Sequence, residues 1–286
     1  MAYDHGIPLL EHLANRRGSL RRSELKVADL VAENPRLVVE STMAGVAAAA
    51  QVSEPTVMRF SMSLGFDGFQ QFRMALAEAL ALGLPATLST VEAGDDATTI
   101  SAKIFDHTIS SLDRARRYLD PQQIEQAVEA LCACSSVVLV GQGASGIIAM
   151  DASQKAALFG VPCVAPEDPH QQFMAVAMGG PGTLVVAVSN TGETRTVIDV
   201  VRLAKERQLV VIGLTGSADT SLGRAVDIPI VVKTFENTDI YTPSVSRLAG
   251  LVVVDILATA VAIRRGQTHS DDLSRMKEAL SVFRRE

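Results

Sequence analysis

Hydroxyl and amide side chains are concentrated in residues 189–194, which read Ser-Asn-Thr-Gly-Glu-Thr. This segment, called loop B below, directly follows the apolar run Leu184–Val188 and precedes a helical pattern. Hydroxyls and the free amides of a helix N-terminus donate hydrogen bonds to an anion, and the helix dipole favours negative charge there. Loop B therefore predicts a phosphate site, unless it is an ordinary capped turn. Its candidate ligands are Ser189, Asn190, Thr191 and Thr194.

A glycine-containing segment, Gly141-Gln-Gly-Ala-Ser145, follows the apolar run Val137–Val140 and is called loop A. With Gly146 it matches Gly-x-Gly-x-x-Gly, a pattern that alone favours a dinucleotide site. However, no acidic residue ends the next apolar run near Val164, where such a site needs one for the ribose. Glycine lets the backbone approach an anion closely. We therefore expect Gly143 and Ser145 to bind the same phosphate ligand as loop B.

Residues 42–60 predict two short helices joined by a tight turn. Thr42 can cap the first helix and Ser53 the second, with Pro55 in the first turn of the second helix. Gln51 occupies the turn position where glycine is often preferred, because the backbone there is left-handed. Apolar residues fall where two crossed helices bury side chains, at Val46, Ala50, Val52, Val57 and Phe60.

The second of these helices carries Thr56, Arg59 and Ser63 at spacings of three and four, which we expect on its outer face. An arginine there can bond guanine edges, and a threonine can contact a phosphate or a thymine methyl. The pattern favours a helix-turn-helix that contacts DNA through Ser53, Thr56 and Arg59. A plain helical hairpin with a solvated Arg59 remains the alternative.

Net charge does not by itself indicate nucleic-acid binding. The chain carries −6, and residues 1–80 contain eight Lys and Arg against nine Asp and Glu. A local cluster could contact phosphates or form a solvated face; it consists of Arg16, Arg17, Arg21 and Arg22. The case for DNA binding therefore depends on the motif.

The pattern of apolar and polar residues divides the chain into two domains joined by a linker. Residues 1–82 contain only short helical patterns, residues 83–97 are turn-rich and acidic, and residues 98–286 alternate apolar runs with helix-length segments. Two helices are expected over 98–118 and 121–132. Such runs predict a five-stranded parallel sheet covered by helices on both faces. The runs are Val137–Val140, Val161–Ala165, Leu184–Val188, Leu209–Leu214 and Ile228–Val232. We therefore predict an all-α helix-turn-helix domain, a linker and an α/β domain.

No signal peptide is visible, and the apolar run Leu248–Ile263 is interrupted by Asp255, so we expect a buried or interface helix without a membrane span. Three cysteines at positions 132, 134 and 163 have no metal spacing and indicate reduced thiols. His107, His170 and His269 also lack a metal spacing. A cytoplasmic protein without metal or cofactor is expected.

These motifs together resemble the RpiR family of bacterial regulators. The segment Val52-Ser-Glu-Pro-Thr-Val-Met-Arg-Phe60, followed by Leu64-Gly-Phe66, is similar to the helix-turn-helix of that family. Loops A and B resemble those of the sugar isomerase (SIS) domain that these regulators carry. Within the family, residues 238–247, 263–266 and 276–280 are similar to the HexR-type group that regulates glucose catabolism.

The resemblance implies a homodimer or homotetramer that binds double-stranded DNA operators near sugar-catabolic genes. It implies release by a phosphorylated sugar acid, 2-keto-3-deoxy-6-phosphogluconate. Carried onto this chain, Ser145 and Ser189 are the principal effector ligands, and Thr56 and Arg59 are the DNA contacts.

Two other classes of function remain open at this point. SIS domains also occur in aldose–ketose isomerases, for which Glu236 and His269 could be proposed as the acid and base. These residues lie in no recognisable acid/base motif, and an isomerase has no use for the N-terminal helices. The other alternative is a sugar-phosphate sensor that binds a protein partner through those helices.

Overall fold

The computed structural model describes residues 9–81, 91, 94–236 and 244–284. The chain forms two compact units, residues 1–113 and 114–286. Most of the predicted linker, at 83–90, 92 and 93, lies outside the described residues. Helix α7 (Ala97–Tyr118) contains the boundary between the units. The exact domain limits 1–82 and 98–286 therefore stay predictions.

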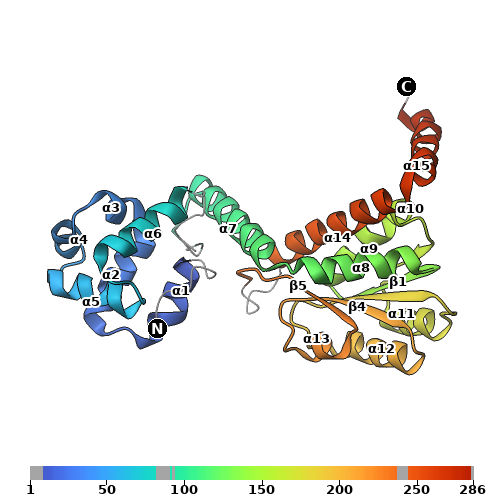
Figure 1. Ribbon diagram of the computed structural model, residues 1–286, viewed down its shortest axis with the longest axis horizontal. Helices are drawn as coiled ribbons and strands as arrows, with labels where there is room; N and C mark the ends of the chain where they lie inside the picture. The colour runs from blue at the N-terminus through green and yellow to red at the C-terminus, as the bar shows by residue number, and fades with distance from the viewer. Residues whose placement is uncertain (1–8, 82–90, 92–93, 237–243, 285–286) are drawn as a thin grey trace. The chain divides into compact units, whose positions relative to one another are not determined.

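The first unit is all-helical, as predicted (Figure 1). Helix α2 ends at Asn34, whose side chain accepts a hydrogen bond from Leu37 N at 3.2 Å and so caps α3. Proline at the first position of α3 suits a helix start, because its missing amide hydrogen would have no partner there. The elements before α7 are α1 (Leu9–Arg16), a 3-10 turn (Arg17–Ser19), α2 (Arg22–Glu33), α3 (Pro35–Glu40), α4 (Met43–Ala49), α5 (Glu54–Ser63) and α6 (Phe69–Ala81).

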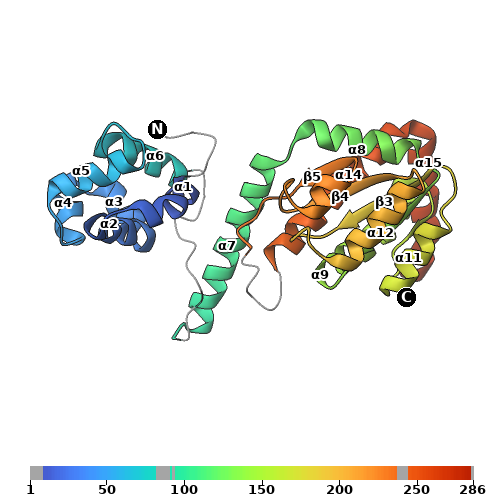
Figure 2. The same ribbon diagram turned by 90° about the horizontal axis from the view of Figure 1, so that it is seen from below.

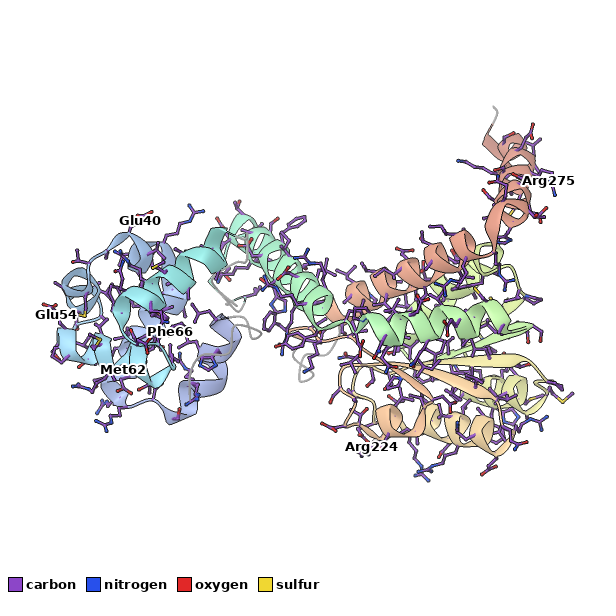
Figure 3. The ribbon with its side chains drawn as sticks, in the orientation of Figure 1. Glu40, Glu54, Met62, Phe66, Arg224 and Arg275 are labelled. Atoms are coloured by element: carbon purple, nitrogen blue, oxygen red, sulfur yellow. The ribbon has the colours of Figure 1, made fainter. Side chains whose placement is uncertain are left out.

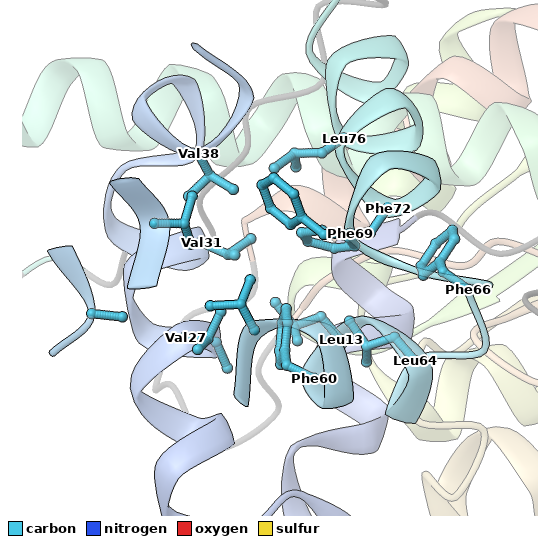
Figure 4. Close-up of a cluster of buried hydrophobic side chains, with 14 of the residues drawn as sticks. Leu13, Val27, Val31, Val38, Phe60, Leu64, Phe66, Phe69, Phe72 and Leu76 are labelled. Carbon is cyan, nitrogen blue, oxygen red and sulfur yellow. The ribbon is translucent and has the colours of Figure 1, made fainter. Parts of the chain in front are cut away.

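Figure 4 shows the core that holds these helices together. Val27 and Val31 of α2 face Phe60 of α5 and Phe72 of α6, and all four are fully buried. The rings of Phe60 and Phe72 meet edge to face with centroids 5.4 Å apart. Burying each such side chain stabilises the fold by about 1.5–3 kcal/mol. This packing sets one face of α5 into the core and leaves another face for solvent.

The second unit contains the predicted five-stranded parallel sheet, in the order β2-β1-β3-β4-β5. Its strands are β1 (Ser136–Gly141), β2 (Cys163–Val164), β3 (Thr183–Val188), β4 (Val210–Thr215) and β5 (Ile228–Val231). The predicted strand 161–165 was too long. Pro162 and Pro166 flank β2 and have no amide hydrogen for the ladder, so this edge strand pairs only through residues 163 and 164.

Helices cover both faces of the sheet (Figures 1 and 2). Helices α8 (Pro121–Ala133), α9 (Ala144–Gln154) and α14 (Val245–Arg264) lie on one face. Helices α11 (Pro169–Ala177), α12 (Arg195–Glu206) and α13 (Ser221–Ala225) lie on the other. Burial from both sides explains why every residue of β3 is both non-charged and buried. The remaining elements are α10 (Ala156–Phe159), α15 (Gly266–Leu280) and a 3-10 turn (Ser281–Arg284).

The chain leaves β1 for β2 on one side and returns to β3 on the other, so β1 and β3 are neighbours. Their carboxyl ends form a switch point, where parallel sheets commonly bind ligands. Loops A and B follow these two strands.

Helix α14 is long and apolar enough to cross a membrane by length and composition alone, with a mean hydropathy of 1.9. Within this fold it packs against α8 and α9, and 44% of its most apolar window is buried. Its position agrees with the expected buried or interface helix.

Candidate functional sites

Loop B is held in shape by its own hydroxyl groups. Ser189 is buried, and its Oγ lies 3.0 Å from Thr194 Oγ1 and 3.5 Å from Thr191 Oγ1. The same Oγ accepts a hydrogen bond from Gly192 N at 3.1 Å. Thr194 is the N-cap of α12, and its side chain makes no capping hydrogen bond. The first amides of α12 therefore point at the position where three hydroxyls converge, which is an arrangement suited to an anion.

A close approach to α13 fixes the turn within loop B. Gly192 has φ +66°, and a Cβ built there would lie 2.2 Å from Thr220 Oγ1. Glu193 accepts hydrogen bonds from the amide and hydroxyl of Ser221, at 2.8 and 2.7 Å. These bonds to Ser221 lower the pKa of the exposed Glu193 carboxyl. Glu193 is thereby turned toward α13 and away from the hydroxyl cluster.

Loop A is held by a buried glutamine on α11. Gln172 Nε2 donates to Gly141 O at 2.9 Å and to Pro166 O at 2.7 Å, while its Oε1 accepts from Gln142 Nε2 at 3.1 Å. Gly143 has φ +56° and is the N-cap of α9, again without a side-chain cap. The N-terminus of α9 therefore opens toward the same edge of the sheet as α12.

The two loops border one pocket with a volume of about 180 Å³. The pocket brings together five of the six predicted ligands, which are Ser145, Ser189, Asn190, Thr191 and Thr194. Gly143 is not among the lining residues. Another wall of this pocket contains Glu236, which was considered only as a catalytic group, and Ser246 and Arg247, which the sequence analysis missed. The only feature of the sequence that could have indicated this wall is Arg247, near the start of the apolar helix α14.

Glu236 and His269 are not brought together as an acid/base pair. Glu236 lines the pocket, where its carboxylate accepts backbone hydrogen bonds from Ser244 and Ser246. His269 lies on α15, with Nε2 3.2 Å from Leu158 O, and does not line the pocket. Among the residues that the structure describes, no group of three or more His, Cys, Asp or Glu could hold a metal ion.

Lys155, the residue after α9, pairs with Asp151 of α9 and with Asp255 of α14 at 3.2 Å. These ion pairs link α9 to α14. Lys155 does not line the pocket, so its role in this unit is structural.

Helices α4 and α5 form the predicted helix-turn-helix. Thr42 Oγ1 accepts a hydrogen bond from Gly45 N at 3.2 Å and caps α4. Gln51 adopts φ +53°, so the turn takes the left-handed conformation despite having no glycine there. Val46, Val57 and Phe60 are fully buried between the helices, as expected.

Two details of α5 differ from prediction. Ser53 is the N-cap, but its Oγ pairs with Thr56 Oγ1 at 3.0 Å instead of capping a backbone amide. Thr56 was expected on the outer face of α5, but it is only 4% exposed. Its hydroxyl also accepts from the Arg59 guanidinium at 3.0 Å, and Arg59 itself is exposed. Met62, labelled in Figure 3, is 59% exposed on the last turn of α5.

A basic groove runs between the start of α2 and the start of α5. Arg21, Arg22 and Lys26 line it together with Ser53 and Thr56. The arginine cluster noted in the sequence is thus continuous with the N-terminus of the second helix of the motif. Positive charge beside a helix N-terminus is suited to a phosphate backbone.

These two sites define a class of protein. A helix-turn-helix bordered by basic side chains, joined to an α/β unit with an anion pocket at its switch point, is the architecture of a ligand-responsive DNA-binding regulator. Residues 7–83 match the helix-turn-helix domain of the rpiR family, and residues 130–260 match the SIS domain.

Known regulators are similar over nearly the whole chain. The chain is 39% identical to the HTH-type transcriptional regulator HexR of Escherichia coli K12 over 276 residues, which is 96% of this chain and 95% of the relative. It is 39% identical to HexR of Pseudomonas aeruginosa PAO1 over 272 residues, with 95% of each chain covered. The solved structure of Vibrio vulnificus NanR complexed with ManNAc-6P has a TM-score of 0.61 and 25% identity, covering 96% of this chain and 98% of that chain.

The chain belongs to the RpiR family of helix-turn-helix transcriptional regulators. It is a HexR-type DNA-binding transcriptional regulator of sugar metabolism that carries a SIS domain.

Proposed function

We propose that operator binding by this regulator is controlled by a phosphorylated sugar acid, 2-keto-3-deoxy-6-phosphogluconate, bound between loops A and B. The main support for this proposal is that Ser145, Ser189 and Thr194 line one pocket at the switch point of the sheet. Two uncapped helix N-termini, those of α9 and α12, open at the same edge. Neutral donors and helix dipoles of this kind favour a phosphate.

On the DNA side, we propose that α5 reads the operator and that the basic groove binds its backbone. Arg59 is the exposed group of α5 that can reach base edges, while Thr56 orients the Arg59 guanidinium. Ser53 lies at the mouth of the groove and contacts a phosphate together with Arg21 and Arg22. This assigns base reading to a single side chain and assigns affinity to the neighbouring phosphate contacts.

We propose that the protein acts in the cytoplasm as a homodimer or homotetramer. One near-neutral helix-turn-helix makes few phosphate contacts, so two modules on one duplex are needed for useful affinity. The exposed side chains of α14 support self-association, because Leu248, Val252 and Ile256 recur every four residues along one stripe and are 39, 46 and 37% exposed. A continuous apolar stripe of this kind is typical of an interface.

The test is fluorescence anisotropy of the protein on DNA from its own promoter region, with 2-keto-3-deoxy-6-phosphogluconate added at increasing concentration. We expect operator release at micromolar to millimolar effector and no release by the unphosphorylated sugar acid. Release by another sugar phosphate alone would replace the effector but keep the site. Failure of every sugar phosphate to change DNA binding would contradict the proposal.

A further inference from the structure

The pocket has a second polar wall that the phosphate loops do not explain. Beyond loops A and B it reaches the first turns of α14, where Ser246, Arg247 and Gly250 line it. A phosphate bound to loops A and B leaves this α14 wall for the rest of the ligand. The α14 wall therefore faces whatever the ligand carries at its other end.

A carboxylate already occupies the N-terminus of α14. Glu236 Oε2 accepts hydrogen bonds from Ser246 N at 2.8 Å and from Ser244 N at 3.1 Å. Ser244 is the N-cap of this 20-residue helix, and its own side chain makes no capping bond. The positive end of a long helix favours an anion at this place. In the structure, that anion is supplied by the chain itself.

Two polar side chains beside Glu236 have no partner within the described part of the chain. Ser246 is 7% exposed, lines the pocket and makes no side-chain hydrogen bond with any described residue. Arg247 lines the pocket half-buried, and none of the described carboxylates pairs with it. The Ser246 hydroxyl borders the pocket and is free to bond a ligand there, and a half-buried guanidinium favours a carboxylate. Both groups are thus prepared for a ligand in the pocket.

We propose that Ser246, Arg247 and the first amides of α14 form a carboxylate subsite, and that Glu236 occupies this subsite until a sugar acid phosphate displaces it. The inference rests on the proposed function, because the phosphate end of the same ligand is bound by loops A and B. It assigns the preference for a sugar acid over a neutral sugar to Arg247. It also makes Glu236 an internal competitor whose removal strengthens binding.

Glu236 follows a short segment that is attached to α7. The residues immediately before it are held by α7: Arg114 donates to Thr234 O at 3.2 Å, and its guanidinium lies 4.4 Å from the centroid of the Phe235 ring. Displacement by a ligand would give Glu236 a second position besides the one bound to α14, at the end of a segment fastened to α7. A two-state element of this kind is what ligand control of a distant property requires.

The experiment is calorimetry of the full chain with 6-phosphogluconate and with glucitol 6-phosphate, two open-chain phosphates that differ only at C1, where the first has a carboxylate and the second a hydroxymethyl group. In wild type, we expect the sugar acid to bind at least about tenfold more tightly, because the carboxylate gains charged hydrogen bonds. Arg247→Ala should weaken binding of the sugar acid by about ten- to a hundredfold and change binding of glucitol 6-phosphate little, and Arg247→Lys should restore part of the loss. Glu236→Gln should increase the affinity for the sugar acid several-fold, whereas the exposed control Glu206→Gln should leave this affinity unchanged.

Equal affinity of wild type for the two ligands would overturn the subsite. Unchanged sugar-acid affinity in Arg247→Ala would overturn it as well, even if Ser189→Ala abolished binding and so supported the proposed function. Conversely, 6-phosphogluconate binding that depends on Arg247, with no operator release by 2-keto-3-deoxy-6-phosphogluconate, would uphold the subsite and reject only the proposed effector.

Discussion

Gln172 holds loop A in place from across the sheet edge, because its side-chain amide donates to Gly141 O at 2.9 Å. Gln172 is 1% exposed, and its second acceptor, Pro166 O, lies 2.7 Å away. One buried amide thus donates to two backbone carbonyls, that of Gly141 in loop A and that of Pro166 before α11. The conformation of loop A therefore depends on a residue thirty positions away that does not line the pocket.

Gln172→Met should destabilise the α/β unit and weaken effector binding together. Methionine fills similar space but donates no hydrogen bond, so Gly141 O and Pro166 O lose their donor, at a cost of about 1–3 kcal/mol. Thermal denaturation and calorimetry with the effector are the measurements. The neighbouring exposed Gln171 supplies the control, since Gln171→Met should change neither. An unchanged melting temperature in Gln172→Met would show that loop A does not depend on this amide.

Arg59→Ala should remove specific operator binding without unfolding the helical unit. Val57 and Phe60 keep their buried contacts, and only the hydrogen bond from Arg59 to Thr56 is lost within the protein. A lost arginine contact to a base should cost about 1–3 kcal/mol per half-site. Anisotropy at constant salt is the measurement. Arg202→Ala on α12 removes the same charge from an exposed site and serves as the control. Wild-type affinity in the Arg59 variant would reject α5 as the reading helix.

The parallel sheet and its ligand edge could be predicted from sequence because they depend on local patterns. Continuous apolar runs such as Leu184–Val188 mark strands buried on both faces, and the hydroxyls of loop B follow such a run directly. Neighbouring parallel strands bring their carboxyl ends to one edge, so Ser145 and Ser189 could be placed together without coordinates. Local sequence patterns were therefore sufficient to predict the sheet and this part of the site.

Other features needed three dimensions. The burial of Thr56 depends on how far α5 is rotated against α2 and α6, which spacing alone leaves open by a fraction of a turn. Arg247 reaches the pocket only because α14 crosses the sheet beside α9, a packing relation between segments a hundred residues apart. Glu236 was considered as a catalytic acid or base because it is a carboxylate, whereas in the structure it accepts hydrogen bonds from backbone amides. Contacts between distant segments such as these leave no pattern in the local sequence.

Val252→Asp should disrupt self-association while leaving the fold intact. Val252 is 46% exposed at the centre of the α14 stripe, so a charge there is tolerated in a monomer but must be desolvated in an interface. Light scattering at micromolar concentration should report a dimer or larger assembly for wild type and a smaller species for the variant. The control is Val210→Asp, which places a charge at a 44% exposed valine on another part of the unit. A monomeric wild type would contradict the proposed oligomer.

Gly192→Ala should destabilise the α/β unit and abolish the effector response. The added methyl would meet Thr220 Oγ1 at 2.2 Å, and the φ of +66° adds strain of about 1–2 kcal/mol for a residue with a side chain. Either loop B or α13 must therefore move. Gly180→Ala is the matched control, because a Cβ there meets nothing within 4 Å. Equal melting temperatures for the two variants would contradict the close approach of Gly192 to Thr220.

Ser189→Ala should abolish the effector response and leave operator binding unchanged. Ser189 follows β3 directly and is 2% exposed, and its hydroxyl lies beside those of Thr191 and Thr194 at the start of α12. Loss of a hydrogen bond to a charged phosphate should weaken the effector by about 1.5–3 kcal/mol, or roughly ten- to a hundredfold. Ser145→Ala should act similarly if both loops bind one phosphate. Calorimetry with 2-keto-3-deoxy-6-phosphogluconate and anisotropy on the operator measure the two properties separately.

Ser153→Ala is the control, because that hydroxyl donates to Met150 O within α9 and does not line the pocket. Wild-type effector affinity in Ser189→Ala would mean that the phosphate binds elsewhere.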